Sequence, residues 1–270
     1  MIYIVAHKAF EMPKIVTEGG YTPIFVGGGK EYAHSINSLT DDRGDEQISI
    51  KNPTFCELTA LYWMWKNDIK SEYMGLNHYR RYFLSNVSGQ ILTYSEINSL
   101  MSKCDIVLSS RIRFKSSVRM HLYRTSCYIK DVELMEMIVR KMSPDYSPIL
   151  SKYLEGNVMS YANMFIMSRY NLDNYCEWLF SILFEMEKEE NMEGYTNPEK
   201  RLYGYLGELL INVWAEYNKL KVIELPVYNV EVGKMSYFET LKIKIIRIVK
   251  EFVKAILYFP SGIPFRRRKS

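Results

Sequence analysis

The sequence predicts an α/β protein with a mostly parallel, Rossmann-like sheet, because short apolar runs alternate with segments of helical periodicity. The first apolar runs are Ile2–Ala6 and residues 22–26, and polar or glycine residues follow each of them directly. The segments between the runs repeat apolar residues every three or four positions. The 270 residues, 47% hydrophobic and 24% charged, suffice for one large domain with a full core.

The remaining elements follow the same alternation. Helix 54–67 begins where Thr54 and Glu57 have the S/T-x-x-E spacing of a capping box. Further strands are predicted at 73–76, 105–109, 164–167 and 222–225, and further helices at 94–103, 131–142, 172–190 and 199–217. No regular element is predicted for the basic segment 111–127.

The positive charge is concentrated at the end of the chain. Residues 234–270 hold ten Lys and Arg and two Glu, a net charge of +8, whereas the whole chain carries +4, which leaves −4 for residues 1–233. We therefore expect a domain at 1–233 and a basic tail at 234–270. A body without a basic stripe disfavours nucleic-acid binding.

Within the tail, residues 237–258 predict an amphipathic helix with apolar residues on one side and Arg247, Lys250 and Lys254 on the other. Such a helix, followed by four basic residues at 266–269, is typical of proteins that lie on an anionic membrane surface. Packing against the body or a second subunit is the alternative.

The four cysteines form no CxxC pair, which disfavours a zinc site or a disulfide framework and favours reducing cytosol. Neither a secretory leader nor a membrane-spanning run is recognisable. We therefore expect a cytoplasmic protein, peripheral on the inner face of the cell membrane.

Parallel sheets bind ligands at the carboxyl ends of their strands. Lys8, the glycines at 27–29 and the segment His78-Tyr79-Arg80-Arg81 all directly follow predicted strands. Adjacent arginines beside a histidine predict an anion site, since arginine stays charged and donates two hydrogen bonds to phosphate. A surface cluster of ion pairs is the alternative.

A second candidate site lies on helix 199–217. Arg201, Gly204 and Glu208 share a helix face beside the apolar stripe. A glycine inside a helix costs about 1 kcal/mol relative to alanine, which suggests that another group approaches closely there. Glu208 is a candidate general base, and a solvated face without function is the alternative.

The strings GDEQISIKNPTFCELTALYWMWKN, YMGLNHYRRYF, NMFIMSRYNLDNYCEWLFSILFEMEKE and RLYGYLGELLINVW resemble a bacterial capsular and exopolysaccharide glycosyltransferase family long catalogued as a domain of unknown function. The resemblance covers roughly residues 2–230. It implies a GT-A fold and an activated sugar donor, with UDP-galactofuranose as the first expectation. Together with the basic tail, which would hold the enzyme at the membrane, it leads us to expect inverting transfer to a lipid-linked oligosaccharide. Another UDP-hexose, transfer with retention, or a non-catalytic assembly protein of the polysaccharide machinery are the alternatives.

Provisional roles follow from the positions of the candidate residues in the predicted elements, given the expected activity. Glu208 would be the catalytic base and Asn163 would face the acceptor. The family motif that contains the string CELT includes Glu57, although a capping box with Thr54 would account for a glutamate at that position without any functional role. The tryptophans of the helices are expected in the core. The donor would be bound by Lys8, His78, Tyr79, Arg80, Arg81 and Arg201.

The sequence departs from the GT-A pattern in one respect. The D-x-D pair that holds a divalent metal on the diphosphate is missing at 77–81. Arg80 and Arg81 would then replace part of the metal's charge. Asp41, Asp42 and Asp45 in a neighbouring loop could still bind Mn²⁺ or Mg²⁺, and an exposed acidic turn is the alternative.

Overall fold

The computed structural model describes residues 1–17, 19–35 and 38–232. The predicted amphipathic helix at 237–258 and the basic tail lie outside these residues. Two compact units divide the chain, Met1–Tyr228 and Asn229–Ser270. The first unit holds the sheet, its covering helices and every candidate site residue. The second contributes only residues 229–232 to the described part, including the end of β11 (Val227–Asn229) and the 3₁₀ turn Val230–Val232. The predicted boundary after residue 233 stays a prediction.

The sheet has the strand order β10-β6-β9-β4-β1-β2-β3. Its strands are β10 (Val222–Leu225), β6 (Ile106–Ser109), β9 (Phe165–Ser168), β4 (Tyr73–His78), β1 (Ile2–Ala6), β2 (Tyr21–Phe25) and β3 (Leu39–Thr40). Neighbouring strands run parallel except at β9, which is antiparallel to both β4 and β6. The predicted mostly parallel α/β sheet is therefore confirmed for the described residues.

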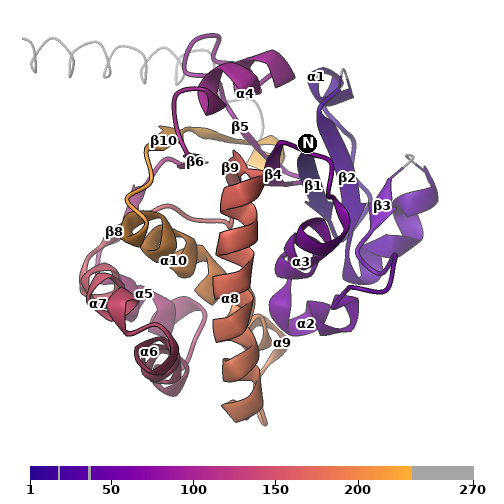
Figure 1. Ribbon diagram of the computed structural model, residues 1–270. Helices are drawn as coiled ribbons and strands as arrows, with labels where there is room; N and C mark the ends of the chain where they lie inside the picture. Colours follow the sequence, from indigo (N-terminus) through magenta and orange to yellow (C-terminus); the bar gives the residue numbers. More distant parts are fainter. Residues whose placement is uncertain (18, 36–37, 233–270) are drawn as a thin grey trace, which may run out of the picture. The chain divides into compact units, whose positions relative to one another are not determined.

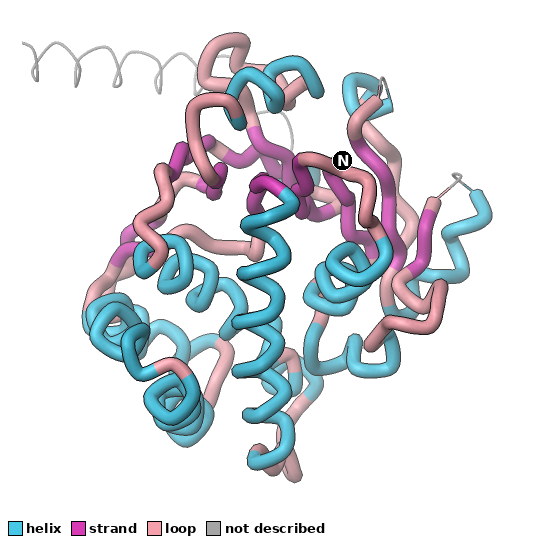
Figure 2. The backbone as a smooth tube through the Cα atoms, in the orientation of Figure 1, coloured by secondary structure: helices cyan, strands magenta, loops and turns pink. Residues whose placement is uncertain are grey.

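Helices cover both faces of the sheet (Figure 1). One face packs on α3 (Leu58–Asn67), α8 (Arg169–Glu189) and α10 (Leu202–Tyr217), and α4 (Tyr94–Met101) lies on the other. The strand residues alternate accordingly: Tyr3 and Val5 of β1 belong to the large core, and Ile2 belongs to the smaller one. Figure 2 shows the strands as one layer between these helices.

Four further helices extend the large core: α2 (Asn52–Phe55), α5 (Val118–Thr125), α6 (Ile129–Met142) and α7 (Ser147–Glu155). The short helix α1 (Lys14–Thr17) follows β1, and α9 (Asn197–Lys200), before α10, contributes no residue to this core. The segment 111–127, for which no element was predicted, contains β7 (Ile112–Arg113), which pairs with β8 (Val158–Met159), and α5. Trp63 is buried, Trp65 and Trp178 pack against the same core, and the expectation that these rings are core residues is confirmed. In the described part, no helix is long and apolar enough to cross a bilayer.

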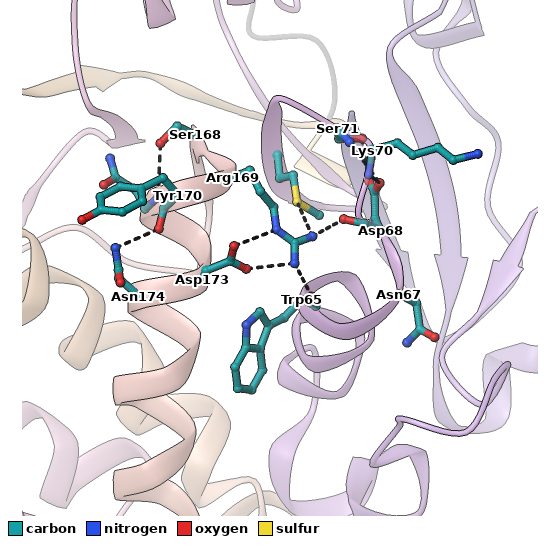
Figure 3. A network of polar contacts seen from close by, with 12 residues as sticks. Trp65, Asn67, Asp68, Lys70, Ser71, Ser168, Arg169, Tyr170, Asp173 and Asn174 are labelled. Carbon is teal, nitrogen blue, oxygen red and sulfur yellow. Dashed lines mark hydrogen bonds and ion pairs between the residues drawn. The ribbon is translucent and has the colours of Figure 1, made fainter.

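Arg169 ties the start of α8 to the end of α3, at the edge of the sheet where β4 begins (Figure 3). Its guanidinium donates to the backbone carbonyls of Trp65, at 2.6 Å, and Asp68, and it pairs with Asp173 at 2.9 Å. The last carbonyls of a helix have no partner within the helix, so an arginine that satisfies them stabilises the end of α3.

Replacing Arg169 by methionine is expected to lower the free energy of unfolding by about 2–3 kcal/mol, because it leaves carbonyls of α3 without their charged donor. For a domain of this size that corresponds to a fall in Tm of roughly 5–10 °C. Thermal unfolding followed by circular dichroism measures it, with Arg140→Met on the exposed face of α6 as the control. Equal Tm values for the two variants would contradict the stabilising role of Arg169.

Candidate active site

A cleft of about 720 Å³ opens at the carboxyl ends of β1, β2 and β4. Its walls come from the ends of these strands, from the junction of α2 and α3 and from the junction of α9 and α10. The lining combines cations with two carboxylates. The charged and titratable residues that line it are His7, Glu57, His78, Arg80, Arg81, Lys200, Arg201 and Glu208. The two sites predicted from the sequence therefore line one cavity: the segment 78–81 at the edge of the sheet, and Arg201 and Glu208 on the helical segment 199–217.

The paired arginines are placed by a tight hairpin between β4 and β5 (Arg81–Phe83), in which His78 pairs with Arg81 and Tyr79 and Arg80 form the turn. The backbone N–H of Tyr79 donates to Val5 O at 3.0 Å and fixes this turn against β1. Both Arg80 and Arg81 line the cleft. The two arginines therefore lie at a cavity, as a site for an anion requires.

Tyr79, which was predicted to bind the donor, contributes to the cleft lining, although most of its side chain is buried. The ring of His7 meets it edge-on at 5.2 Å between centroids, and the cations of Lys8 and Arg80 lie 5.2 and 5.8 Å from its centre. Lys8 is exposed and is not among the residues that line the cleft. The contact of Lys8 with the donor therefore stays a prediction. The ring of Tyr79 stabilises the positions of the Lys8 and Arg80 cations through cation–π contacts.

Arg201 reaches the cleft because helix 199–217 is interrupted, contrary to the prediction of one continuous helix. The chain leaves α9 at Arg201, whose φ and ψ are −72° and 20°, and begins α10 at Leu202. The Arg201 guanidinium donates through Nε to the Sγ of Cys56 at 3.3 Å. Thr196 and Glu199 form the capping box that starts α9.

The prediction that Thr54 and Glu57 form a capping box was wrong. The helix begins two residues earlier, at Asn52, and Thr54 donates its hydroxyl to Lys51 O at 3.1 Å. At Cys56 the backbone takes φ 52° and ψ −128°, which ends α2 and lets α3 start at Leu58. This positive φ is unusual for a residue with a side chain, and such strain is concentrated at functional sites. The kink turns Glu57 into the cleft.

Glu208 lies among the cleft residues on α10, about two turns beyond Arg201. Burial, together with the negative charge of Glu57, raises the pKa of Glu208 to about 7, against an ordinary value of 4.5. Hydrogen bonding from the Ala162 backbone and the charges of Arg81 and Arg201 act in the opposite direction. A carboxylate with a pKa near neutrality is suited to accept a proton at physiological pH.

His78 is held at the cleft by a 2.5 Å hydrogen bond between its Nε2 and Ala162 O. Since that carbonyl can only accept, the ring carries its proton on Nε2. Burial lowers the pKa of His78, and the positive charges of Arg81 and Arg80 lower it further, against the opposing effects of Glu57 and Ala162 O. A neutral His78 next to the arginines leaves the binding of negative charge to Arg80 and Arg81.

The expectation that Asn163 faces an acceptor is corrected by its burial, since only 3% of the residue is exposed and it lies outside the cleft lining. Its side-chain amide donates to Glu57 Oε1 at 2.7 Å and to Gly204 O at 2.8 Å. Asn163 therefore supports Glu57 from behind. The sequence contained no sign of this contact, because the two residues are 106 positions apart.

Gly204 is the close-packing glycine that the sequence predicts. A Cβ at this position would lie 3.1 Å from the Cβ and 3.2 Å from the Sγ of Cys56. The absent side chain lets α10 approach the kink after α2, which brings Glu208 and Glu57 to the same cavity. The predicted close approach is confirmed, and the approaching group is protein rather than ligand.

The acidic loop lies apart from the cleft lining. Asp41 is fully buried, whereas Asp42 and Asp45 are exposed. Lys30 pairs with Asp41 at 3.3 Å and with Asp42 at 3.0 Å, and Ser49 donates to Asp41. Over the described ranges, no group of three or more His, Cys, Asp or Glu side chains could hold a metal ion. Because Lys30 pairs with both Asp41 and Asp42, this loop does not present the free carboxylates that the metal prediction requires.

A family model described as a domain of unknown function, DUF4422, matches residues 1–219. The chain belongs to this family. The DUF4422 region includes the kink at Cys56, the arginine hairpin and the start of α10. A search among curated proteins finds no match to the chain.

The DUF4422 chain is also similar to the solved structure of WbbM, a bifunctional glycosyltransferase in its apo form, with a TM-score of 0.73 and 32% sequence identity. The match covers 85% of this chain and 45% of that chain, so this chain spans less than half of the length of WbbM. The likeness confirms the predicted GT-A-like fold.

Proposed function

We propose that this DUF4422 chain is a glycosyltransferase of surface-polysaccharide biosynthesis, which transfers a sugar from a nucleotide donor with inversion. Similarity to WbbM over most of the chain supports the class of enzyme. The observation that carries the proposal is the composition of one cleft, where Arg80, Arg81 and Arg201 are joined by Glu208. Transfer of an activated sugar needs cations for the departing diphosphate and a base for the attacking hydroxyl.

In this reaction the acceptor hydroxyl oxygen forms a bond to the anomeric carbon of the donor sugar. The bond between that carbon and the diphosphate oxygen breaks, and the electron pair leaves with the nucleoside diphosphate. The hydroxyl proton moves to Glu208, whose raised pKa matches this task. Arg80 and Arg81 stabilise the negative charge that develops on the diphosphate, and Arg201 closes the cleft from the side of α10.

The finer assignments follow the family resemblance. The donor proposed is UDP-galactofuranose, and the acceptor is a lipid-linked oligosaccharide. The ten cations at 234–270 support a location at the anionic inner surface of the cell membrane, where such acceptors reside.

A donor panel tests the proposal. UDP-galactofuranose is expected to raise the Tm of the purified chain in a concentration-dependent way, and to be consumed when a synthetic lipid-linked acceptor is added. Nuclear magnetic resonance of the product gives the linkage and the anomeric configuration. The same reactions run with a chelator are expected to keep their rate.

Several outcomes would change the proposal. Turnover of another UDP-hexose alone would replace the donor, and retention of the anomeric configuration would remove the role of Glu208 as the base for an inverting attack. A chain that shows no thermal shift with any sugar nucleotide would instead be a non-catalytic assembly protein. Complete loss of transfer in the chelator would establish a metal requirement.

A further inference from the structure

Three titratable groups of the cleft are held by one short turn of the chain. Ala162 O accepts the hydrogen bond of His78, and the Ala162 backbone also hydrogen-bonds Glu208. The Asn163 side chain donates to Glu57. The turn immediately precedes β9, which inserts between β4 and β6. Because β9 is antiparallel to its neighbours, its first residue lies at the edge where those parallel strands end.

The backbone of this turn is in an unusual conformation. Ala162 and Asn163 both have positive φ, 72° and 47°, and alanine rarely takes such values. Both residues are buried. The surrounding hydrogen bonds must hold this conformation, and such strain is retained where it orients functional groups.

Among the three titratable groups, Glu57 is the one that a side chain of the turn, that of Asn163, binds directly. The Asn163 amide bridges Glu57 Oε1 and the carbonyl of Gly204, which lies one helical turn before Glu208 on α10. One side chain thus fixes the distance between the kink that carries Glu57 and the helix that carries Glu208. Gly204 permits this close approach, since a Cβ at that position would lie only 3.1 Å from the Cβ of Cys56.

The electrostatic consequence follows from the charges that face Glu208. From the α2–α3 junction comes the negative charge of Glu57, from β5 the positive charge of Arg81 and from the α9–α10 junction that of Arg201. Arg80, Lys200, His7 and His78 line the same cavity. Of the charged groups that affect Glu208, Glu57 is the one that favours its protonated form.

We propose that Glu57 is a positioning residue for sugar transfer: held by Asn163, which also binds the carbonyl of Gly204 on the helix of Glu208, its carboxylate acts on Glu208 across the cleft and keeps it aligned with the acceptor hydroxyl. This inference rests on the proposed function for its catalytic meaning, but the interaction between the two carboxylates is a property of the free protein. Glu57 itself takes no proton from the substrate. It acts through Glu208.

The first experiment needs no substrate. The chain is labelled with ¹³C at the glutamate side-chain carboxyl groups and titrated by nuclear magnetic resonance, and the signal absent from Glu208→Gln identifies Glu208. Glu57→Gln keeps an acceptor oxygen for Asn163 but removes the charge. It is expected to lower the titration midpoint of Glu208 by about one pH unit, whereas Glu193→Gln on an exposed loop leaves it unchanged.

The second experiment measures transfer. Glu57→Gln should move the acid limb of the kcat profile to lower pH by the same amount and reduce kcat about tenfold on the plateau, with little change in the donor KM. Asn163→Gly keeps the positive φ without strain and removes the amide. It should reproduce the loss of kcat, and circular dichroism confirms that both variants are folded.

An unchanged Glu208 midpoint in Glu57→Gln would overturn the inference, whatever the enzyme transfers. So would a loss confined to the donor KM, which would make Glu57 a binding residue. Failure of the proposed function has a different signature. In that case no sugar nucleotide binds to the unaltered chain, while Glu57→Gln still shifts the titration midpoint of Glu208.

Discussion

Replacing Glu208 by glutamine is expected to lower kcat by a factor of about 10²–10⁴, the range attributed to general base catalysis. The substitution preserves the shape of the side chain but removes its ability to take a proton. Donor binding should persist, because the cations that line the cleft are untouched. Initial rates with saturating donor and acceptor measure the effect, and donor affinity is followed separately by thermal shift.

The pH dependence gives an independent check on the same residue. Since the pKa of Glu208 is raised to about 7, the carboxylate is ionised above that pH and protonated below it. The rate of transfer should therefore be about half of its maximum near pH 7, approach that maximum about one pH unit higher, and fall about tenfold for each pH unit well below 7. Glu216→Gln, two turns further along α10, serves as the matched control. A Glu208→Gln variant with normal turnover would refute the assignment.

Replacing Arg81 by methionine should weaken donor binding by a factor of about 10–150, which corresponds to about 1.5–3 kcal/mol for a charged hydrogen bond. Arg81 begins β5, and its neighbour Arg80 occupies the hairpin turn. Because the diphosphate gains charge as the sugar leaves, kcat should fall as well as affinity. Calorimetric titration with nucleoside diphosphate measures the loss of affinity, and steady-state rates measure the fall in kcat.

A matched variant separates this effect from general loss of positive charge. Arg140→Met changes the net charge equally but lies on the exposed face of α6. Unaltered affinity in Arg81→Met, or an equal decrease in both variants, would contradict the assignment of the diphosphate to the β4–β5 hairpin.

The longer strands of the sheet were predictable because buried strands need continuous apolar runs. The strands of two or three residues, such as β3 and β7, were not predicted, because so short a segment contains no such run. The arginine hairpin was also predictable, since it directly follows β4 and the carboxyl edge of a sheet is where ligands bind. Gly204 was recognisable for a similar reason. Each of these signals is local, so a short window of sequence contains it.

The sequence-based predictions were wrong where the backbone leaves a helix unexpectedly and where a role depends on residues that are distant in sequence. The Thr54–Glu57 spacing fitted a helix start, but a positive φ at Cys56 shifts the start of α3 to Leu58. Nothing in the residue type signals that conformation, because cysteine has no preference for it. Asn163 presented the same difficulty, since its partners Glu57 and Gly204 are distant in sequence. Such contacts arise only when the whole domain has folded.

The reversed strand β9 also restricts how relatives of this chain can diverge. Asn163 at one edge of the sheet and Arg169 at the other are separated by five residues, four of which form β9. Inserting or deleting one residue between them would turn every following side chain to the opposite face of the sheet. Length variation should therefore be found in surface loops such as 85–91, while the interval from 163 to 169 keeps a constant number of residues across the family.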